Sequence, residues 1–218
     1  EIVATFMGAH EVPDEWKHDR AEYVRIICEE MIPQVAEDGL AEFCDVFCER
    51  GVFDPAESTR ILQAGLEHGL KPKIHADELA ASGGSLVAGE IGAVSADHLM
   101  QITPDGIDAL RSASVVATLL PGTTFYLRKS GYASARPLID AGLDLAIATD
   151  RNPGSCTIES MLFIAGLSVM HLGLTPGDAL RAATYGGAMA LDREKVCGSI
   201  EEGKRADLIL WNAPDEDV

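Results

Sequence analysis

Short apolar runs alternate along the chain with segments that carry apolar residues at helical spacing. The runs have the length of strands, and glycine, proline or charged residues bound them, as expected for strands buried on both faces. The apolar runs are residues 2–10, 43–48, 72–77, 91–99, 114–120 and 143–150. The helical segments between them include residues 21–39, 55–69, 103–113 and 135–142.

Local signals support these helices. Thr103 and Thr175 are each followed by proline, which predicts a helix N-cap with proline in the first turn. Gly39, Gly69 and Gly142 stand where helices should end. Strand–helix alternation sustained over this length predicts an α/β fold with parallel strands and right-handed crossovers.

The ends of the apolar runs decide between two parallel architectures. A doubly wound open sheet favours a GxGxxG turn after its first strand, and the sequence has none. A (β/α)8 barrel instead carries its chemistry at the carboxyl ends of many strands. His10, His75, His98 and Asp150 close four different runs. We therefore predict a TIM-type barrel, and because the chain begins within an apolar run, we expect only strands 3–8 here.

Each of these residues alone has a structural explanation, since a strand-end histidine is often a packing residue and an aspartate is often an N-cap. Their recurrence at strand ends favours a site. His75 and Glu78 lie in KIHADEL, and His98 closes the next run. Neutral imidazole is a good ligand for zinc or iron, and a nearby carboxylate can transfer protons. The competing interpretation is that the acids of this segment favour the dipole of the following helix.

The last run ends in ATDRNPGS, which supplies further candidates. Asp150 can ligate a cation and accept a proton from its water. Asn152, Gly154 and Ser155 offer amide and hydroxyl groups to a polar substrate. A hydrolytic metal site needs these parts: a cation, a base beside it and donors for the oxyanion.

Composition narrows the classes of partner. Acidic residues outnumber basic residues by 35 to 17, and the formal net charge is −18. Such a surface repels nucleic acid and anionic membranes. No apolar run approaches the roughly 18 residues of a transmembrane helix. The cysteines form no CxxC pair, and Cys44 and Cys48 lie in an apolar run, so we expect buried thiols and a reducing cytoplasm.

Several stretches also carry a family resemblance. They are TFMGAHEVP (5–13), FCDVFCERGVF (43–53), KIHADEL (73–79), ADHL (96–99), LLPGTTFYL (119–127), ATDRNPGSC (148–156) and GSIEEGKRADLILWN (198–212). In order and spacing the chain resembles the amidohydrolase superfamily and, within it, the imidazolonepropionase family. ATD followed by NPGS is the most discriminating element, because HxxE also occurs in purine and pyrimidine deaminases.

The resemblance implies an activity: hydrolysis of the cyclic amide of 4-imidazolone-5-propanoate to N-formimidoyl-L-glutamate, in histidine degradation. It implies one zinc or iron ion as cofactor and suggests a homodimer, whereas the expectation of no nucleic-acid and no membrane partner comes from the net charge. The roles that it implies are metal ligation by His75 and Asp150, catalysis by Glu78, His98 and Asp150, substrate contact by His10, Glu78 and Ser155, and product contact by Asn152 and Gly154.

The chain also departs from the family pattern. It lacks the His-x-His pair of the first strand and the upstream Arg and Tyr that would hold the propionate. We therefore expect a fragment that is inactive alone, with residues 1–195 as a partial barrel and 196–218 as the beginning of a β-sandwich. Two alternatives stay open: a deaminase acting on a nucleobase-like ring, and a catalytically incomplete binding module.

Overall fold

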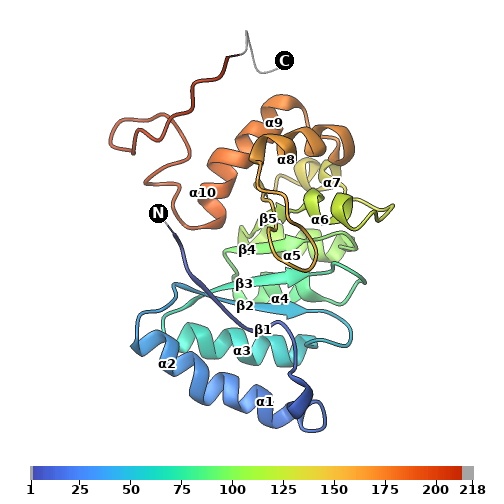
Figure 1. The fold of residues 1–218 in the computed structure, drawn as a ribbon, viewed down its shortest axis with the longest axis vertical. Coiled ribbons are helices and arrows are strands. Elements are labelled where there is room, and N and C mark those ends of the chain that lie inside the picture. The colour runs from blue at the N-terminus through green and yellow to red at the C-terminus, as the bar shows by residue number, and fades with distance from the viewer. Residues whose placement is uncertain (1, 213–218) are drawn as a thin grey trace. The chain divides into compact units, whose positions relative to one another are not determined.

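Parallel strands and helices alternate through the computed structural model, which describes residues 2–212 (Figure 1). The chain divides into two compact units, Glu1–Val115 and Val116–Val218. None of the helices in the described range is long and apolar enough to cross a membrane.

The first unit contains four strands and the helices that connect them. Its elements are β1 (Thr5–Ala9), η1 (Asp14–Trp16), α1 (Arg20–Ile26), η2 (Ile27–Met31), α2 (Ile32–Glu37), β2 (Phe43–Cys48), α3 (Pro55–Glu67), β3 (Lys71–Ala76), α4 (Gly84–Ile91), β4 (Ser95–His98) and α5 (Pro104–Ala113). Neighbouring strands pair in chain order, β1 with β2, β2 with β3 and β3 with β4, and every pairing is parallel.

The second unit contains the remaining elements. They are β5 (Val116–Leu119), α6 (Pro121–Tyr126), α7 (Ala135–Asp140), β6 (Leu145–Ile147), α8 (Met161–Leu167), η3 (Ser168–Leu172), α9 (Pro176–Arg181), η4 (Ala182–Gly186) and α10 (Gly187–Ala190). β5 and β6 pair in parallel. η4 packs so closely on β6 that a Cβ added to Gly186 would lie 1.9 Å from the carbonyl oxygen of Leu145.

The predicted strands and caps are confirmed. Each predicted apolar run corresponds to one strand, although β1, β4, β5 and β6 are shorter than their runs and β3 lies one residue earlier than its run. Thr103 caps α5 by accepting a hydrogen bond from the Gly106 amide, and Thr175 forms a capping box with Asp178. The sequence analysis named no helix over α4, α6, α8 or α10. α4 contains two glycines, and α6 is a single short turn after a strand.

The two faces of the first unit's sheet differ in character. Residues in register on parallel strands share a face, and successive residues alternate between faces. The register places Asp45 beside Lys73 and Ser95, and Phe47 beside His75 and Asp97. We call this side the polar face, and its polar members are Asp45, Lys73, His75, Ser95 and Asp97.

Helices cover the opposite face, which is apolar. α3 packs on β2 and β3, and α4 packs on β3 and β4. The approach is close: a Cβ added to Gly84 at the start of α4 would lie 2.8 Å from the Cβ of Ala76. Burial against these helices raises the pKa of the Cys44 thiol to about 12 and that of Cys48 to about 11. Both residues are buried, unpaired thiols, as predicted.

A bulge in β1 changes which face the end of that strand presents. Phe6 lies opposite Cys44, but Ala9 lies opposite Val46, which is one residue short of the uninterrupted register. A shift of one residue moves the following side chains to the other face of the sheet. Because of this bulge, His10 lies on the polar face rather than under the helices.

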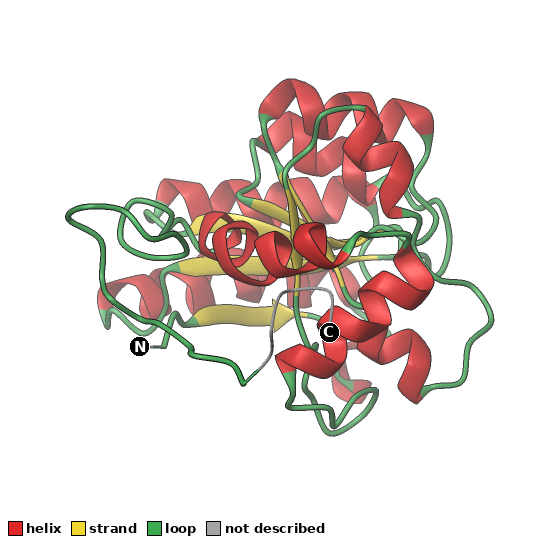
Figure 2. Ribbon diagram, turned by 90° about the horizontal axis from the view of Figure 1, so that it is seen from above, coloured by secondary structure: helices red, strands yellow, loops and turns green. Residues whose placement is uncertain are grey.

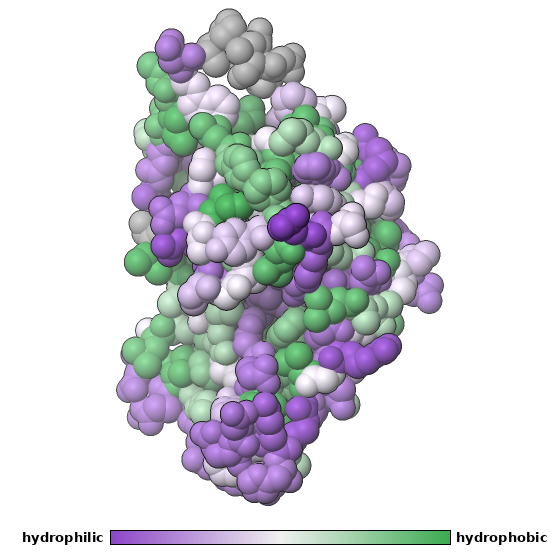
Figure 3. Space-filling model, turned by 45° about the vertical axis from the view of Figure 1, so that its right-hand side comes forward, coloured by the Kyte–Doolittle hydropathy of each residue, from purple (hydrophilic) through white to green (hydrophobic). Residues whose placement is uncertain are grey.

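The surface near α1 is strongly hydrophilic, as the lower end of the space-filling view shows (Figure 3). In α1 and η2, the guanidinium of Arg25 lies 2.7 Å from Glu22, 3.2 Å from Glu29 and 2.8 Å from Glu30. Exposed pairs of this kind contribute little to stability. They keep this end of the first unit solvated.

Residues 191–212 follow α10 as a long loop without helix or strand (Figure 2). The predicted boundary at residue 195 and the predicted β-sandwich over 196–218 stay predictions, because residues 213–218 lie outside the described residues.

Candidate functional site

The backbone turns sharply where several strands end. Asp77 follows β3 with a φ of 50°, His98 ends β4 with a φ of 75°, and Asp150 follows β6 with a φ of 51°. Residues other than glycine rarely adopt this left-handed region, and each such residue costs on the order of 1–3 kcal/mol. Aspartate and histidine tolerate it best. Strain of this kind clusters at functional sites, and two of these three residues, His98 and Asp150, are ones that the sequence analysis selected.

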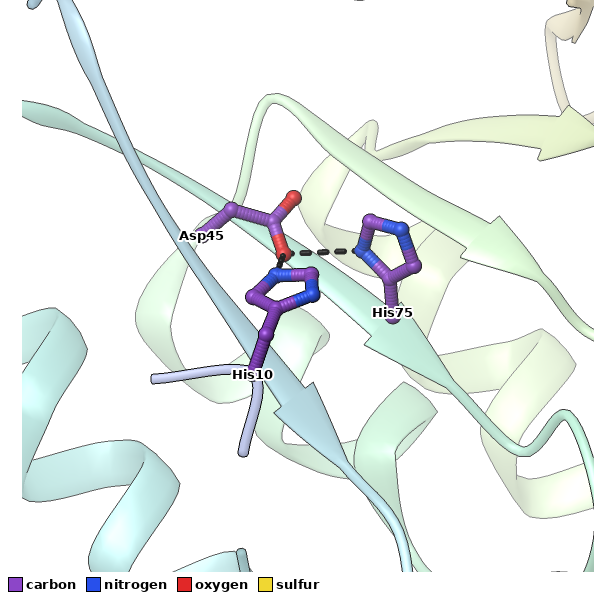
Figure 4. Close-up of side chains that lie close together, drawn as sticks. All are labelled: His10, Asp45 and His75. Carbon is purple, nitrogen blue, oxygen red and sulfur yellow. Dashed lines mark hydrogen bonds and ion pairs between the residues drawn. The ribbon is translucent and has the colours of Figure 1, made fainter. Parts of the chain in front are cut away.

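Three side chains of the first unit form a cluster on the polar face, which we call the Asp45 cluster (His10, Asp45 and His75). His10 Nε2 and His75 Nδ1 each lie 2.8 Å from the same oxygen, Oδ1 of Asp45 (Figure 4). The two rings meet edge to face, with their centroids 4.6 Å apart. Asp45 is only 1% exposed, so these contacts are protected from water.

The two imidazoles keep Asp45 ionised. Burial raises the pKa of this carboxyl, but electrostatic attraction to His75 and the hydrogen bonds from both histidines outweigh burial and hold the pKa well below its ordinary value. An ionised carboxylate only accepts hydrogen bonds, so both contacting ring nitrogens donate.

The Asp45 cluster has the chemistry of a metal site. One nitrogen or oxygen from each of His10, Asp45 and His75 lies within 4.8 Å of the other two. Imidazole and carboxylate are the common ligands of zinc and of non-haem iron. The residue types on the polar face therefore fit a divalent metal ion, and because Nδ1 of His75 donates to Asp45, this ring would bind such an ion through Nε2.

Glu78 and His98 extend this cluster. His98 Nε2 lies 3.6 Å from a carboxylate oxygen of Glu78, and the ring of His98 lies 5.2 Å from that of His75 between centroids. His98 is 4% exposed. The structure thus brings four of the predicted residues together within the first unit: His10, His75, Glu78 and His98.

Two buried carboxylates hold the loop that carries Glu78. Asp77 accepts hydrogen bonds from the amides of Gly83 and Ser85, so it caps the start of α4. That contact is the helix-dipole role considered in the sequence analysis, and Asp77 takes it while Glu78 faces His98.

Glu49, just after β2, holds the same loop from its other side. It accepts hydrogen bonds from the amides of Leu79 (2.7 Å) and Ala80 (3.3 Å) and from the hydroxyl of Ser82. Burial raises its pKa, but these hydrogen bonds outweigh burial and lower it below the ordinary value. Glu49 is 1% exposed, so its hydrogen bonds to the loop form in the protein interior.

The remaining predicted residues lie together in the second unit, in a turn that we call the Asp150 turn (residues 150–156). The Thr123 hydroxyl donates to the carboxylate of Asp150. The side-chain amide of Asn152 donates to the Asp150 carbonyl (2.8 Å) and to the Ser155 hydroxyl (2.7 Å). Its side-chain oxygen accepts from the amides of Gly154 (2.9 Å) and Ser155 (2.8 Å). Asn152 therefore organises the turn from within.

The sequence analysis did not select Asp45 or Glu49. A signal was present, because both acids stand in or directly after the apolar run FCDVFC. A carboxylate inside a buried strand is costly unless it is paired, and that cost predicts partners. Which partners it has depends on strand register, which the sequence does not show.

Comparison with known proteins identifies relatives of the whole described chain. The Amidohydrolase family profile matches residues 56–217. An imidazolonepropionase from Shouchella clausii (strain KSM-K16) is 54% identical over 99% of this chain and 48% of its own length. One from Geobacillus kaustophilus (strain HTA426) is 52% identical over 99% of this chain and 50% of its own length. The chain thus spans about half the length of these relatives.

Solved structures show the same fold. An adenosine deaminase from Xanthomonas campestris with bound zinc matches with a TM-score of 0.68 and 26% identity, covering 94% of this chain and 51% of the deaminase. The guanine deaminase of E. coli matches with a TM-score of 0.69 and 19% identity, covering 94% of this chain and 51% of that protein. The predicted fold class, part of a barrel of the amidohydrolase kind, is confirmed.

Proposed function

The chain belongs to the amidohydrolase family, and we propose that the full-length protein hydrolyses the cyclic amide of 4-imidazolone-5-propanoate to N-formimidoyl-L-glutamate. Full-length protein here means the product of the complete reading frame. The grouping of imidazoles and carboxylates at strand ends of the first unit carries the proposal, because these are the parts of a metal-dependent hydrolase. The substrate comes from the relatives, which are imidazolonepropionases at 52–54% identity.

We propose one zinc or iron ion as cofactor, with His75 and Asp150 among its ligands. Zinc and non-haem iron both accept imidazole and carboxylate. A catalytic zinc site has three protein ligands, so the full-length protein is proposed to supply the others. When bound, such an ion lowers the pKa of a coordinated water to about 7 and so makes a nucleophile available at neutral pH.

The residues of this chain then have distinct tasks in the proposed reaction. Asp150 accepts the proton of the attacking water, and His98 forms a hydrogen bond with that water or with the ring carbonyl. Water adds to the carbonyl carbon, the ring C–N bond breaks, and the departing nitrogen takes up a proton. No ammonia is released.

Substrate contacts are proposed for His10, Glu78 and Ser155, and product contacts for Asn152 and Gly154. His10 is 23% exposed at its side chain and Glu78 is 13% exposed, so both can reach a ligand above the polar face. Both the amide and the oxygen of the Asn152 side chain already form hydrogen bonds within the Asp150 turn. A contact with the product therefore requires one of these groups to bond the product in addition to its partner in the turn. We also propose a cytoplasmic homodimer that acts on a small-molecule substrate in histidine degradation.

The test incubates the full-length protein, loaded with zinc or with iron, with imidazolone propionate and follows the loss of its ultraviolet absorbance. Formation of N-formimidoylglutamate without ammonia is the expected result. His75→Ala should abolish turnover and lower the metal content. If the loaded protein leaves imidazolone propionate unchanged, the proposal fails.

The alternative, deamination of a nucleobase-like ring, is less well supported, because the adenosine deaminase is 26% identical whereas the imidazolonepropionases are 52–54% identical. Incubating the same preparation with adenosine and guanine and measuring released ammonia separates the two reactions. Ammonia release from a purine, together with unchanged imidazolone propionate, would favour the deaminase.

A further inference from the structure

One oxygen of Asp45 accepts hydrogen bonds from two imidazoles through different ring nitrogens, Nε2 of His10 and Nδ1 of His75. We propose that Asp45 is a positioning residue that fixes the two histidines in opposite tautomers. The proposal deepens the proposed function, and it rests on that function only for the roles of the two histidines. The geometry of the bonds stands without it.

The tautomers follow from the direction of the bonds. A neutral imidazole carries one proton, and the nitrogen that donates must hold it. His75 donates through Nδ1, so its lone pair is on Nε2. His10 donates through Nε2, so its lone pair is on Nδ1. Because of its bonds to Asp45, His75 has its acceptor nitrogen at Nε2 and His10 has its acceptor nitrogen at Nδ1.

The burial of Asp45 within the sheet is energetically unfavourable unless its charge is compensated. Asp45 is 1% exposed in the middle of a strand that lies between β1 and β3, and an unpaired carboxylate there would be strongly destabilising. The β1 bulge moves His10 to the polar face, and the register of β3 places His75 two residues beyond the neighbour of Asp45. Two donors from separate strands thus compensate one buried charge.

The opposite tautomers assign different chemistry to the two rings. A metal-ligating histidine commonly donates its other N–H to a carboxylate, which fixes ring orientation and raises ligand basicity. His75 has that arrangement. His10 instead offers an acceptor at Nδ1, so it should recognise an N–H donor of the substrate ring. Asp45 would in this way connect metal binding with substrate recognition.

Nitrogen-15 spectra of the metal-free full-length protein with labelled histidines test the tautomers directly. His10→Gln and His75→Gln variants assign the ring signals. We expect a protonated Nδ1 for His75 and a protonated Nε2 for His10. A protonated Nε2 on His75 would overturn the proposal, and this result needs no variant of Asp45 to fold.

Variants of Asp45 test the consequence for the metal. Zinc affinity, measured by chelator competition, should fall about 10–100-fold in Asp45→Ala, and less in Asp45→Asn, which keeps a neutral acceptor. The nitrogen-15 pattern of His75 should change in Asp45→Ala. Affinity within twofold of wild type, with an unchanged pattern, would contradict the proposal.

Asp97 provides the matched control. It is buried on the same face, 8% exposed, and accepts from the Ser95 hydroxyl at 2.8 Å, in a chain that continues to Lys73. Asp97→Ala and Asp97→Asn should lower stability while leaving the tautomers of His10 and His75 and the zinc affinity unchanged. Equal losses in both series would show a general packing effect and refute a specific role of Asp45.

The outcomes separate this inference from the proposed function. If the tautomers and zinc affinity behave as expected but imidazolone propionate is not hydrolysed, the proposed function fails and the positioning role of Asp45 stands. If hydrolysis occurs with the other tautomers, the inference fails and the function stands.

Discussion

The Asp45 cluster and the Asp150 turn place carboxylates in two different ways. In the Asp45 cluster the partners come from other strands, 35 and 30 residues away in the chain. In the Asp150 turn most side-chain bonds connect residues two or three positions apart, and the carboxylate of Asp150 also accepts from the more distant Thr123. One arrangement depends on how strands pair, and the other depends on a local run of residues.

This difference predicts how each region responds to change. A local turn keeps its hydrogen bonds as long as its own backbone keeps its conformation, because the partners are adjacent. A cluster across strands fails when any one strand shifts or any one partner is removed, because a buried charge then lacks compensation. The geometry of the Asp45 cluster therefore rests on long-range packing, and that of the Asp150 turn rests mainly on local hydrogen bonds.

The largest expected effect concerns the Asp150 turn. Asp150→Asn keeps the size of the side chain but removes the proposed base, so we expect kcat on imidazolone propionate to fall by about 10²–10⁴-fold. Steady-state kinetics of the full-length protein measure this loss. Asp140→Asn, at an exposed position that is 68% accessible at the end of α7, is the control and should stay within twofold of wild type. Activity of Asp150→Asn within tenfold of wild type would exclude this base.

A smaller effect is expected at Glu49, a carboxylate of the first unit with backbone and hydroxyl donors instead of imidazoles. Glu49→Gln should lower the free energy of unfolding at pH 7 by about 2 kcal/mol, because charge-assisted hydrogen bonds to the loop are lost. Urea denaturation measures this difference. Glu49→Gln should also lower the activity of the full-length protein, since the loop that Glu49 holds carries Glu78.

The pH dependence of this effect has a definite sign. The folded-state pKa of Glu49 lies below its ordinary value of 4.5, so its contribution is present above pH 4.5 and is lost as pH falls through the folded pKa. The difference in the free energy of unfolding between wild type and Glu49→Gln should therefore become smaller below pH 4.5. Asp178→Asn, in the capping box of α9, should show the same trend with a smaller amplitude, because its lowered pKa arises mainly from one hydroxyl. If the difference in the free energy of unfolding between wild type and Glu49→Gln were the same at pH 3 as at pH 7, this account would be contradicted.

The smallest expected effect separates the two halves of the Asn152 side chain. Asn152→Ala removes the two bonds that the Asn152 oxygen accepts from the amides of Gly154 and Ser155 and also the two bonds that its amide donates to Asp150 and Ser155. The two accepted bonds, at about 1 kcal/mol each, should dominate a loss of about 1–2 kcal/mol in the free energy of unfolding. Ser155→Ala removes only the bond to the Asn152 amide and should cost less. Thermal or urea unfolding of the two variants measures which one loses more stability. A larger loss in Ser155→Ala would show that the turn is not organised by the Asn152 oxygen.

Much of the fold was predictable from the sequence because the relevant interactions are local. The run 43–48 became a strand with the same bounds, and Thr103 caps α5 as its Thr-Pro pair predicts. α4 was missed because its glycines weaken helical periodicity, and packing of Gly84 against Ala76 decides its position. The strand-end histidines were found because residue type and run boundary coincide in the sequence.

The sequence by itself determined the strands, the caps and the residues of the Asp150 turn, since each depends on neighbours a few positions away. Only the tertiary structure decided that His10 and His75 share Asp45. Strand register sets that contact, and the bulge between Phe6 and Ala9 shifts it by one residue. A shift of one residue reverses the face of every side chain that follows, and no pattern of apolar and polar residues along β1 reveals it.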